Sequence, residues 1–547
     1  MADKPETRET AEPAAPLHAD ASSTAPAAPW RPSFNPWLIA VVVAVAAFME
    51  VLDTSIANVA LPYMAGNLGA SNDQSTWVLT SYLVSNAVVL PISGWFASVL
   101  GRKWFFMTCL TIFTVSSMLC GVAPSLGALI VFRILQGAGG GGLQPMAQAI
   151  LADTFPPEKR GLAFALYGVT VIVAPTIGPT LGGWITDNYT WRWIFLINIP
   201  VGICSLLFTS LLIFDPPYLV RKSIKDGLKI DYIGLGLLAA GLGALEITLD
   251  EGQRNDWFSS GAIVAATIIA VVGLISVVMW ELRQKDPVVD FHLLKDRNFA
   301  ISTLTMFMLG FVLYGSTMAL PLFLQTLLGY TAMQSGMALS PGGLAILVMM
   351  PIVGFLLSKF EARWLVIFGL LISSYGLFQM TDFDLNIDFR HAVIARIVQS
   401  LGLAFLFVPI NTMAFYFIAK QNTSYATGLI NLARNIGGST GIAISTTLVA
   451  RRQQFHQQRL LDHLSPLDGA YRSTLESAKQ MFMSKGADAV HATAQAQQMI
   501  YNMVQRQATL LSYLEDFRLL AFTFLAVIPL MLFMKRIRPK KSEMVVD

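Results

Sequence analysis

Long apolar segments recur along the chain, and short stretches of charged residues, proline and glycine separate them. Most approach or exceed the ~20 apolar residues that a helix needs to cross a bilayer. We count fourteen such segments: 37–61, 77–99, 104–122, 126–150, 161–185, 193–214, 231–250, 261–281, 299–324, 336–358, 363–380, 391–418, 426–450 and 515–535. The pattern therefore predicts an all-α integral membrane protein with fourteen transmembrane helices.

Composition supports this prediction and excludes several other classes. Of the 547 residues 54% are hydrophobic and only 13% are charged, against roughly 25% charged residues in soluble proteins. A soluble enzyme is therefore excluded. The net charge of +3 is too balanced to indicate nucleic-acid binding. Cys109, Cys120 and Cys204 lie in apolar segments without metal-ligand or disulfide spacing, so we expect no metal and no cofactor.

Basic residues mark one side of the predicted membrane protein. Short loops on that side carry pairs such as Arg102–Lys103 and Lys159–Arg160, whereas loops on the other side hold little beyond Arg192, Arg254 and Arg390. Basic loops stay in the cytoplasm, so both termini are expected there. The resulting division is a flexible tail (1–36), a six-helix half (37–214), a linker with two extra helices (215–298), the first five helices of a second half (299–450), a long outer loop (451–514), and a last helix with a basic tail (515–547).

The chain also repeats itself at an offset of roughly 260 residues, as duplicated transporter halves do. Leu90–Gly94 resembles Met350–Gly354, and Arg133–Gln136 resembles Arg396–Gln399. The matched segments are eight positions apart in the series of fourteen, which is an even shift, so the two halves run in the same direction. We expect two six-helix repeats with a binding site between them, and the pair 231–250 and 261–281 inserted between the halves.

The outer loop 451–514 is polar and much longer than the other connections. Its flanks, Arg451–Gln458 and Met499–Val504, have the pattern of amphipathic helices. Two interpretations stay open: a docking surface for a partner, and a solvated loop without one.

Charged residues inside predicted helices point to function, because each costs about 2.5–3.5 kcal/mol to insert. Asp53 and Arg133 lie at a similar depth, about 10–12 Å from the outer ends of their helices at 1.5 Å per residue. We expect them to pair, with Asp53 carrying a proton and Arg133 modulating its affinity. The alternative is a buried ion pair that fixes helix register. Glu50, three residues before Asp53, is a second proton site or a group that attracts cationic substrates.

Further polar residues lie deep enough to line a cavity between the halves. The candidates for binding substrate are Glu50, Gln144, Tyr167, Glu246, Asn411 and Asn435. Glu246 is close to the outer end of its helix, so an interfacial role is equally open. Arg434 is a candidate for gating or for packing. Arg396 lies near a helix end, where its side chain could extend to the membrane surface.

Glycine and proline interrupt the segment 161–185. Gly178, Pro179, Gly182 and Gly183 combine lost helix hydrogen bonds with close helix approach, which predicts a hinge or a tight seam between helices. No Gly-Lys-Ser/Thr sequence follows a glycine-rich stretch, so an ATP-driven pump is not indicated.

Taken together, these motifs resemble the major facilitator superfamily, and within it the fourteen-helix drug:proton antiporters of the EmrB/QacA type. The resemblance rests on five segments: Leu52–Pro62, Arg133–Gly139, Gly178–Gly183, Trp191–Pro200 and Asp250–Phe258. It implies export of amphipathic compounds driven by the proton gradient. One departure is that Ser98 and Val99 replace the Asp and Arg that the superfamily usually has before Gly101–Lys103.

The outer loop, with residues 451–461, is similar to that of EmrB. This similarity implies a periplasmic adaptor of the EmrA type, an outer-membrane channel of the TolC type and a place in the bacterial inner membrane. A proton-coupled importer and a lipid or fatty-acid exporter on the same fold are the alternatives. A membrane-embedded enzyme is not indicated, because only His391 among the six histidines touches a predicted span, at its boundary.

Overall fold

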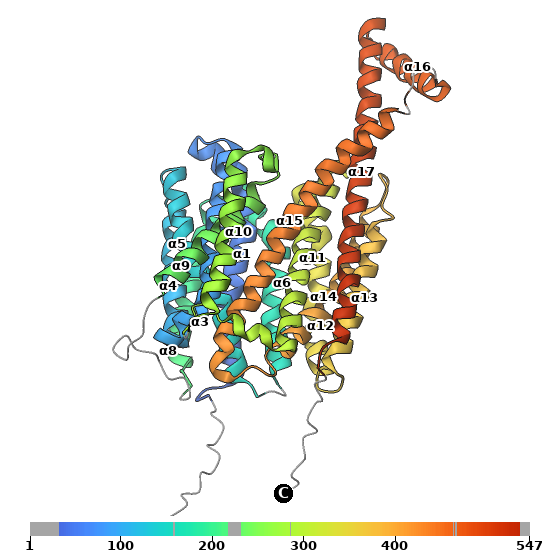
Figure 1. The fold of residues 1–547 in the computed structure, drawn as a ribbon. Helices are drawn as coiled ribbons and strands as arrows, with labels where there is room; N and C mark the ends of the chain where they lie inside the picture. Colours follow the sequence, from blue (N-terminus) through green and yellow to red (C-terminus); the bar gives the residue numbers. More distant parts are fainter. Residues whose placement is uncertain are drawn as a thin grey trace, which may run out of the picture. The chain divides into compact units, whose positions relative to one another are not determined.

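Helices that run side by side build the protein (Figure 1). The computed structural model describes residues 32–535 apart from 157–158, 217–230, 285, 463 and 465–467. The basic tail and most of the predicted N-terminal tail and of the first part of the linker therefore lie outside the described residues. In lipid every backbone N–H and C=O must find a partner within the chain, and a helix satisfies them locally.

The first half contains six long helices and two short ones. They are α1 (Pro36–Leu68), α2 (Asn72–Ser75), α3 (Trp77–Leu100), α4 (Arg102–Gly121), α5 (Leu126–Thr154), α6 (Arg160–Asn188), α7 (Trp193–Leu196) and α8 (Asn198–Leu212). Helix α3 packs on α5, α4 on α5, and α1 on α6.

The remaining helices form the insertion, the second half and an outer extension. They are α9 (Tyr232–Glu251), α10 (Gly261–Glu281), α11 (Arg297–Leu328), α12 (Ala332–Leu356), α13 (Ala362–Met380), α14 (Phe389–Ala414), α15 (Thr423–Asp462), α16 (Gly469–Ser484) and α17 (Ala489–Leu532), with single turns η2 (Trp257–Ser259), η3 (Phe291–Lys295) and η4 (Lys420–Asn422). The halves meet where α12 packs on α6 and where α15 packs on α3.

All fourteen predicted segments coincide with helices, which confirms the fold class. Within the described part of the chain eleven helices are long and apolar enough to span a membrane, and twelve if the bent α6 counts as one span. Helices α15 and α17 hold the other two segments. Both are more polar than the rest, but they pack on each other and on α11 inside the bundle.

The internal repeat is visible in how the first helix of each half ends. Gly69 after α1 and Gly329 after α11 adopt left-handed conformations, with φ of 65° and 71°, which glycine accepts without strain. A capping box follows in both places, Ser71 with Gln74 before α2 and Thr331 with Gln334 before α12. The same local sequence signals therefore form the same turn in both halves.

The inserted pair α9 and α10 packs as a hairpin beside α3 and α15. Thr80 of α3 donates to Asp250 of α9, and Trp257 Nε1 donates to Thr447 Oγ1 of α15 at 3.0 Å. Through these two hydrogen bonds the insertion contacts both halves. Ile268 and Val272 of α10 are more than half exposed, as expected for a helix that faces lipid.

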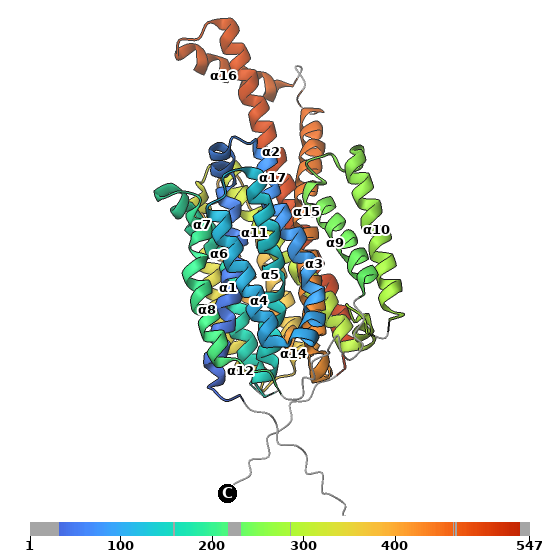
Figure 2. The same ribbon diagram turned by 90° about the vertical axis from the view of Figure 1, so that its left-hand side faces the viewer.

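The outer loop is largely helical rather than irregular. Helix α15 continues to Asp462, α17 begins at Ala489, and α16 packs on α17, so the amphipathic-helix prediction for both flanks is confirmed. These parts project beyond the other helices in both views (Figures 1 and 2). At the base of this extension Arg452 donates to Glu515, and this hydrogen bond raises the pKa of the guanidinium.

Candidate transport site

Asp53 and Arg133 form a buried ion pair in the first half. Asp53 lies on α1 and Arg133 on α5, and Arg133 Nη1 is 2.6 Å from Asp53 Oδ2. Their side chains are 1% and 0% exposed. The depth comparison made from the sequence therefore identifies two residues that meet in space.

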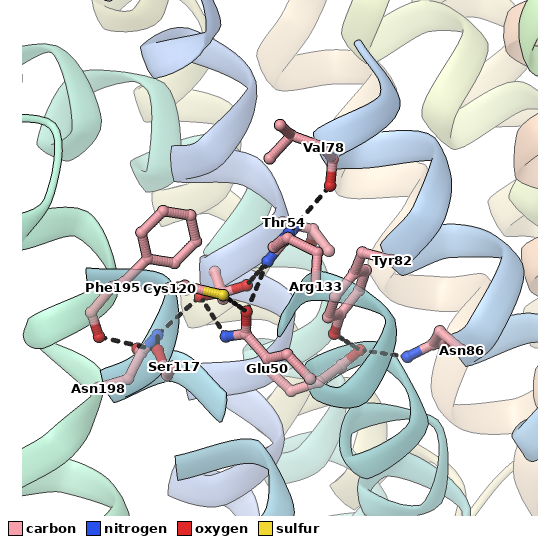
Figure 3. Close-up of polar contacts among 12 residues, drawn as sticks. Glu50, Thr54, Val78, Tyr82, Asn86, Ser117, Cys120, Arg133, Phe195 and Asn198 are labelled. Carbon is pink, nitrogen blue, oxygen red and sulfur yellow. Dashed lines mark hydrogen bonds and ion pairs between the residues drawn. The ribbon is translucent and has the colours of Figure 1, made fainter. Parts of the chain in front are cut away.

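Two amides complete the contacts of the Asp53 carboxylate. Gln136 Nε2 donates to Oδ1 at 3.0 Å and Asn198 Nδ2 donates to the same oxygen at 2.7 Å. Asn198 is held in turn by Ser117, as Figure 3 shows. Every partner of Asp53 is a donor, which is the arrangement that suits an ionised carboxylate. Adding a proton to Asp53 would require at least one donor to turn away.

Arg133 has further contacts that do not depend on Asp53. Its Nε donates to the Val78 carbonyl at 3.0 Å (Figure 3). Its guanidinium also lies 4.2 Å from the centre of the Tyr82 ring and 5.5 Å from that of Phe195, within the range of cation–π attraction. The arginine thus keeps favourable partners when the Asp53 charge is removed.

Glu50 lies in a separate cluster, three residues earlier on α1. Its Oε1 accepts from Tyr82 Oη at 3.0 Å and from Asn86 Nδ2 at 3.1 Å (Figure 3). Its Oε2 accepts from Gln144 Nε2. A Cβ at Gly140 would lie 2.5 Å from the Tyr82 hydroxyl and 3.3 Å from Glu50 Cγ. Glycine at this position therefore makes room for the cluster.

The Glu50 cluster extends across the boundary between the halves. The Gln144 Oε1 atom accepts from Tyr167 Oη at 3.2 Å and from Arg434 Nη2 of α15. Beside Arg434, Asn435 Nδ2 approaches Asn86 Oδ1 at 3.5 Å. Four of the predicted binding residues and Arg434 therefore come together in one network. For Arg434 the structure adds a direct link to the first half.

The other two predicted binding residues lie elsewhere. Asn411 Oδ1 accepts from Gln148 Nε2 at 3.3 Å, and Gln148 Oε1 accepts from Asn431 at 2.7 Å, so these residues continue the polar seam between the halves. Glu246 is buried on α9 near Ser439 of α15. No contact places Glu246 in the Glu50 cluster among the described residues.

The second half repeats the arginine site without its acid. Arg396 Nη1 donates to Gln399 Oε1 at 2.8 Å and to Ser316 Oγ at 3.3 Å. The shift of 263 residues that relates Arg133 to Arg396 also relates Asp53 to Ser316. Arg396 is 2% exposed, so the expectation that it extends to the membrane surface is wrong. Its polar neighbours retain it inside the bundle.

The predicted seam in α6 is a close contact with α1. A Cβ at Gly178 would lie 2.2 Å from Ser55 Oγ, and one at Gly182 would lie 3.1 Å from Ile56. The helix bends by 46° between Pro175 and Ile177. Gly183 has nothing within 4 Å of its Cβ position, so its predicted part in close packing is wrong. The gating role of Gly178, Pro179, Gly182 and Gly183 stays a prediction.

We expect Gly178→Ala to destabilise the protein, because the added methyl group forces α1 and α6 apart. Overpacking of this kind costs about 1–3 kcal/mol, and the apparent melting temperature of the purified protein should fall accordingly. Gly183→Ala on the same helix is the matched control and should leave it unchanged. Equal melting temperatures for the two variants would contradict the seam.

At the predicted cytoplasmic end a different arginine joins the halves. Arg102 pairs with Asp153 of α5 and donates through Nε to Ser424 Oγ of α15 at 2.9 Å. Ser98, which replaces the expected acid, accepts from Tyr425 Oη at 3.3 Å. Contacts between the halves are therefore present at this end despite the departure from the usual loop sequence.

Sequence reasoning missed several residues of the site. They are Tyr82, Asn86, Gln136, Gln148, Asn198 and Asn431. Gln136 was detectable, since it occupies the same place as Gln399 in the repeated Arg-x-x-Gln sequence. Tyr82 and Asn86 are one helical turn apart in an apolar helix, which places them on one face.

Comparison with known proteins agrees with this architecture. The Major Facilitator Superfamily profile matches residues 43–442. The chain is 39% identical over 486 residues to the fatty acid resistance protein FarB of Neisseria gonorrhoeae, covering 89% of this chain and 93% of FarB. It is 36% identical over 499 residues to the multidrug export protein EmrB of Escherichia coli strain K12, covering 91% and 95%.

Solved structures show the same fold. The structure of the proton:xylose symporter XylE superposes with a TM-score of 0.54 at 14% identity, covering 77% of this chain and 90% of XylE. Sequence profile, relatives and fold agree with a multi-pass membrane transporter rather than an enzyme. The chain belongs to the major facilitator superfamily.

Proposed function

We propose that this protein is a proton-coupled efflux antiporter, which exports amphipathic toxic compounds across the bacterial inner membrane. The observation that carries the proposal is the Asp53–Arg133 pair, fully buried and enclosed by donors. A buried carboxylate of this kind in a transporter is a candidate for reversible protonation. The names of the relatives, multidrug export and fatty acid resistance, support export as the direction.

Tyr82 supplies a route by which the proton site and the substrate site can affect each other. Its ring lies against the Arg133 guanidinium, and its hydroxyl donates to Glu50. When Asp53 is protonated, Arg133 loses its counter-charge and relies more on the Tyr82 ring and the Val78 carbonyl. A shift of Tyr82 then changes the hydrogen bonding of Glu50 and, through Gln144, of Arg434. Substrate bound between the halves would in turn change the proton affinity of Asp53 through the same contacts, taken in the opposite order.

In the proposed transport cycle the contacts between the halves at the predicted cytoplasmic end open and close. Arg102 with Asp153 and Ser424 holds the predicted cytoplasmic end together in this structure. Substrate would be released to the outside as a proton binds at Asp53. Breaking the Arg102 contacts would then open the predicted cytoplasmic side for the next substrate. FarB, at 39% identity, favours fatty acids as a second substrate group.

We further propose that the protein is the inner-membrane part of a tripartite pump. The basic residues of the short loops favour a cytoplasmic position for both termini, and in that orientation the α15–α17 extension lies in the periplasm. The extension carries an open hollow of about 480 Å³ with apolar side chains from Phe482, Met499 and Met503 in its lining. Such a surface suits an adaptor of the EmrA type, which would connect to an outer-membrane channel of the TolC type.

The transport proposal is tested by proton release from the purified protein on addition of substrate. Lipophilic cations, weak acids and neutral antibiotics would be added in weakly buffered solution, with compound binding measured in parallel. An antiporter releases protons as a substrate binds. Binding without proton release for every compound would contradict antiport, and uptake driven by an inward proton gradient would indicate an importer.

The docking proposal predicts that a shortened extension loses the adaptor but keeps transport. Residues 460–498 would be replaced by a short Gly-Ser linker, which retains the hydrogen bond from Gln457 to Tyr501 at the base. We expect adaptor co-purification to disappear while proton-driven transport in liposomes continues. Unchanged co-purification would favour the solvated loop without a partner.

A further inference from the structure

Arg434 is a buried guanidinium without an acidic partner among the residues that the structure describes. It is 1% exposed on α15, at the boundary between the halves. Its Nη2 donates to Gln144 Oε1 and, at 3.5 Å, to Asn435 Oδ1, and the neutral Tyr167 is a further neighbour. The buried Nε has no acceptor in the described ranges. By contrast Arg133 and Arg102, the other arginines at the site, each pair with a carboxylate.

This arrangement leaves a positive charge incompletely neutralised. A charge away from water is strongly unfavourable unless an opposite charge and hydrogen bonds compensate it. The nearest acid in the network, Glu50, is separated from Arg434 by Gln144, which contacts both through its two ends. The Gln144 carbonyl that accepts from Arg434 carries only a dipole and no negative charge. The site therefore has room in its charge balance for one anion.

The surroundings of Arg434 suit an amphipathic molecule. Tyr167 lies within hydrogen-bonding reach of Arg434, and its ring is 5.9 Å from the ring of Phe407. Tyr314 is also a neighbour of Arg434 and packs over Gly438, one turn further along α15, where a Cβ would lie 2.6 Å from its ring. A polar head at Arg434 would thus have aromatic walls from both halves beside it. Such walls accept an apolar tail.

We propose that Arg434 binds the anionic headgroup of amphipathic substrates, namely a carboxylate, which takes the place of Gln144 Oε1. The inference rests on the proposed efflux function and names one substrate class for it. A guanidinium can bind a carboxylate through two parallel hydrogen bonds, which an amide carbonyl cannot match. When Gln144 is released from Arg434, its hydrogen bond to Glu50 also weakens. An anion bound at Arg434 therefore changes the hydrogen bonding of Glu50 on α1.

The test compares three probes that share one tail: dodecanoate, dodecyltrimethylammonium and dodecanol. Radiolabelled probe would be bound to the full-length protein in lipid nanodiscs at alkaline pH. Wild type should bind dodecanoate more tightly than dodecanol. Arg434→Gln should weaken dodecanoate binding about 10- to 100-fold, the worth of a charge-assisted hydrogen bond, and leave dodecyltrimethylammonium binding equal or tighter. Arg434→Lys should restore part of the loss.

A matched control distinguishes the loss of headgroup binding from a general effect of removing a buried guanidinium. Arg396→Gln removes another buried guanidinium, whose partners all lie within the second half, and should keep dodecanoate binding. Glu50→Gln removes a nearby negative charge and should tighten dodecanoate while weakening the cation.

The outcomes that would refute anion binding at Arg434 differ from those that would refute efflux. Equal binding of dodecanoate and dodecanol by wild type overturns the inference, even if Arg434→Gln does not fold. Undiminished dodecanoate binding by a folded Arg434→Gln variant overturns it as well. Neither result affects efflux itself, since proton release with other compounds would persist. Loss of proton release with all compounds would instead refute the efflux proposal.

Discussion

Replacing Asp53 by asparagine is expected to abolish proton-coupled transport while the protein still folds and still binds substrate. Asparagine has nearly the same shape and retains an oxygen that can accept from Gln136 and Asn198, but it cannot take up or release a proton. Proton release on substrate addition should disappear, and transport driven by a pH gradient should fall to background. Both are measured with purified protein, the second after reconstitution into liposomes.

The chain offers a matched control for this experiment. Asp516 of α17 is another fully buried carboxylate, and its side chain lies beside Ser445 of α15. Asp516→Asn removes the same charge from the second half and should leave proton release intact. Normal transport by Asp53→Asn would mean that the Asp53–Arg133 pair only fixes helix register.

The second large effect is expected on stability. Arg133→Leu leaves the Asp53 carboxylate buried with two amide donors and no counter-charge. Breaking a buried pair from one side costs about 3–5 kcal/mol, so the variant should be poorly expressed or melt at a much lower temperature. Detergent-solubilised protein followed by size-exclusion chromatography and thermal unfolding gives the measurement.

A double variant shows whether the stranded charge is the cause. In Asp53→Asn/Arg133→Leu no charge remains, so most of the lost stability should return although transport does not. The four proteins form a thermodynamic cycle whose interaction energy reports the pair. Additive losses in the double variant would show that Arg133 acts mainly through Val78 and the aromatic rings.

The architecture was readable from the sequence because bilayer thickness imposes a length and hydropathy on every span. The duplicated halves were readable because Arg133–Gln136 and Arg396–Gln399 keep their spacing. Asp53 and Arg133 could be paired in advance because depth in a membrane follows from residue number along a helix. The extent of α15 and α17 beyond the membrane was less visible, since polar helices lack the apolar signal.

Other features were decided only by the tertiary structure. Depth says nothing about helix rotation or about which helices are neighbours, so the contacts of Gln136 and Asn198 with Asp53 could not be derived from spacing. The same holds for Arg434, whose link to Gln144 joins segments 290 residues apart. Gly178 and Gly183 look alike in the sequence, yet only Gly178 faces α1. The sequence by itself determined the spans, the repeat and the buried acid; packing between helices decided which side chains meet that acid and where an unpaired arginine lies.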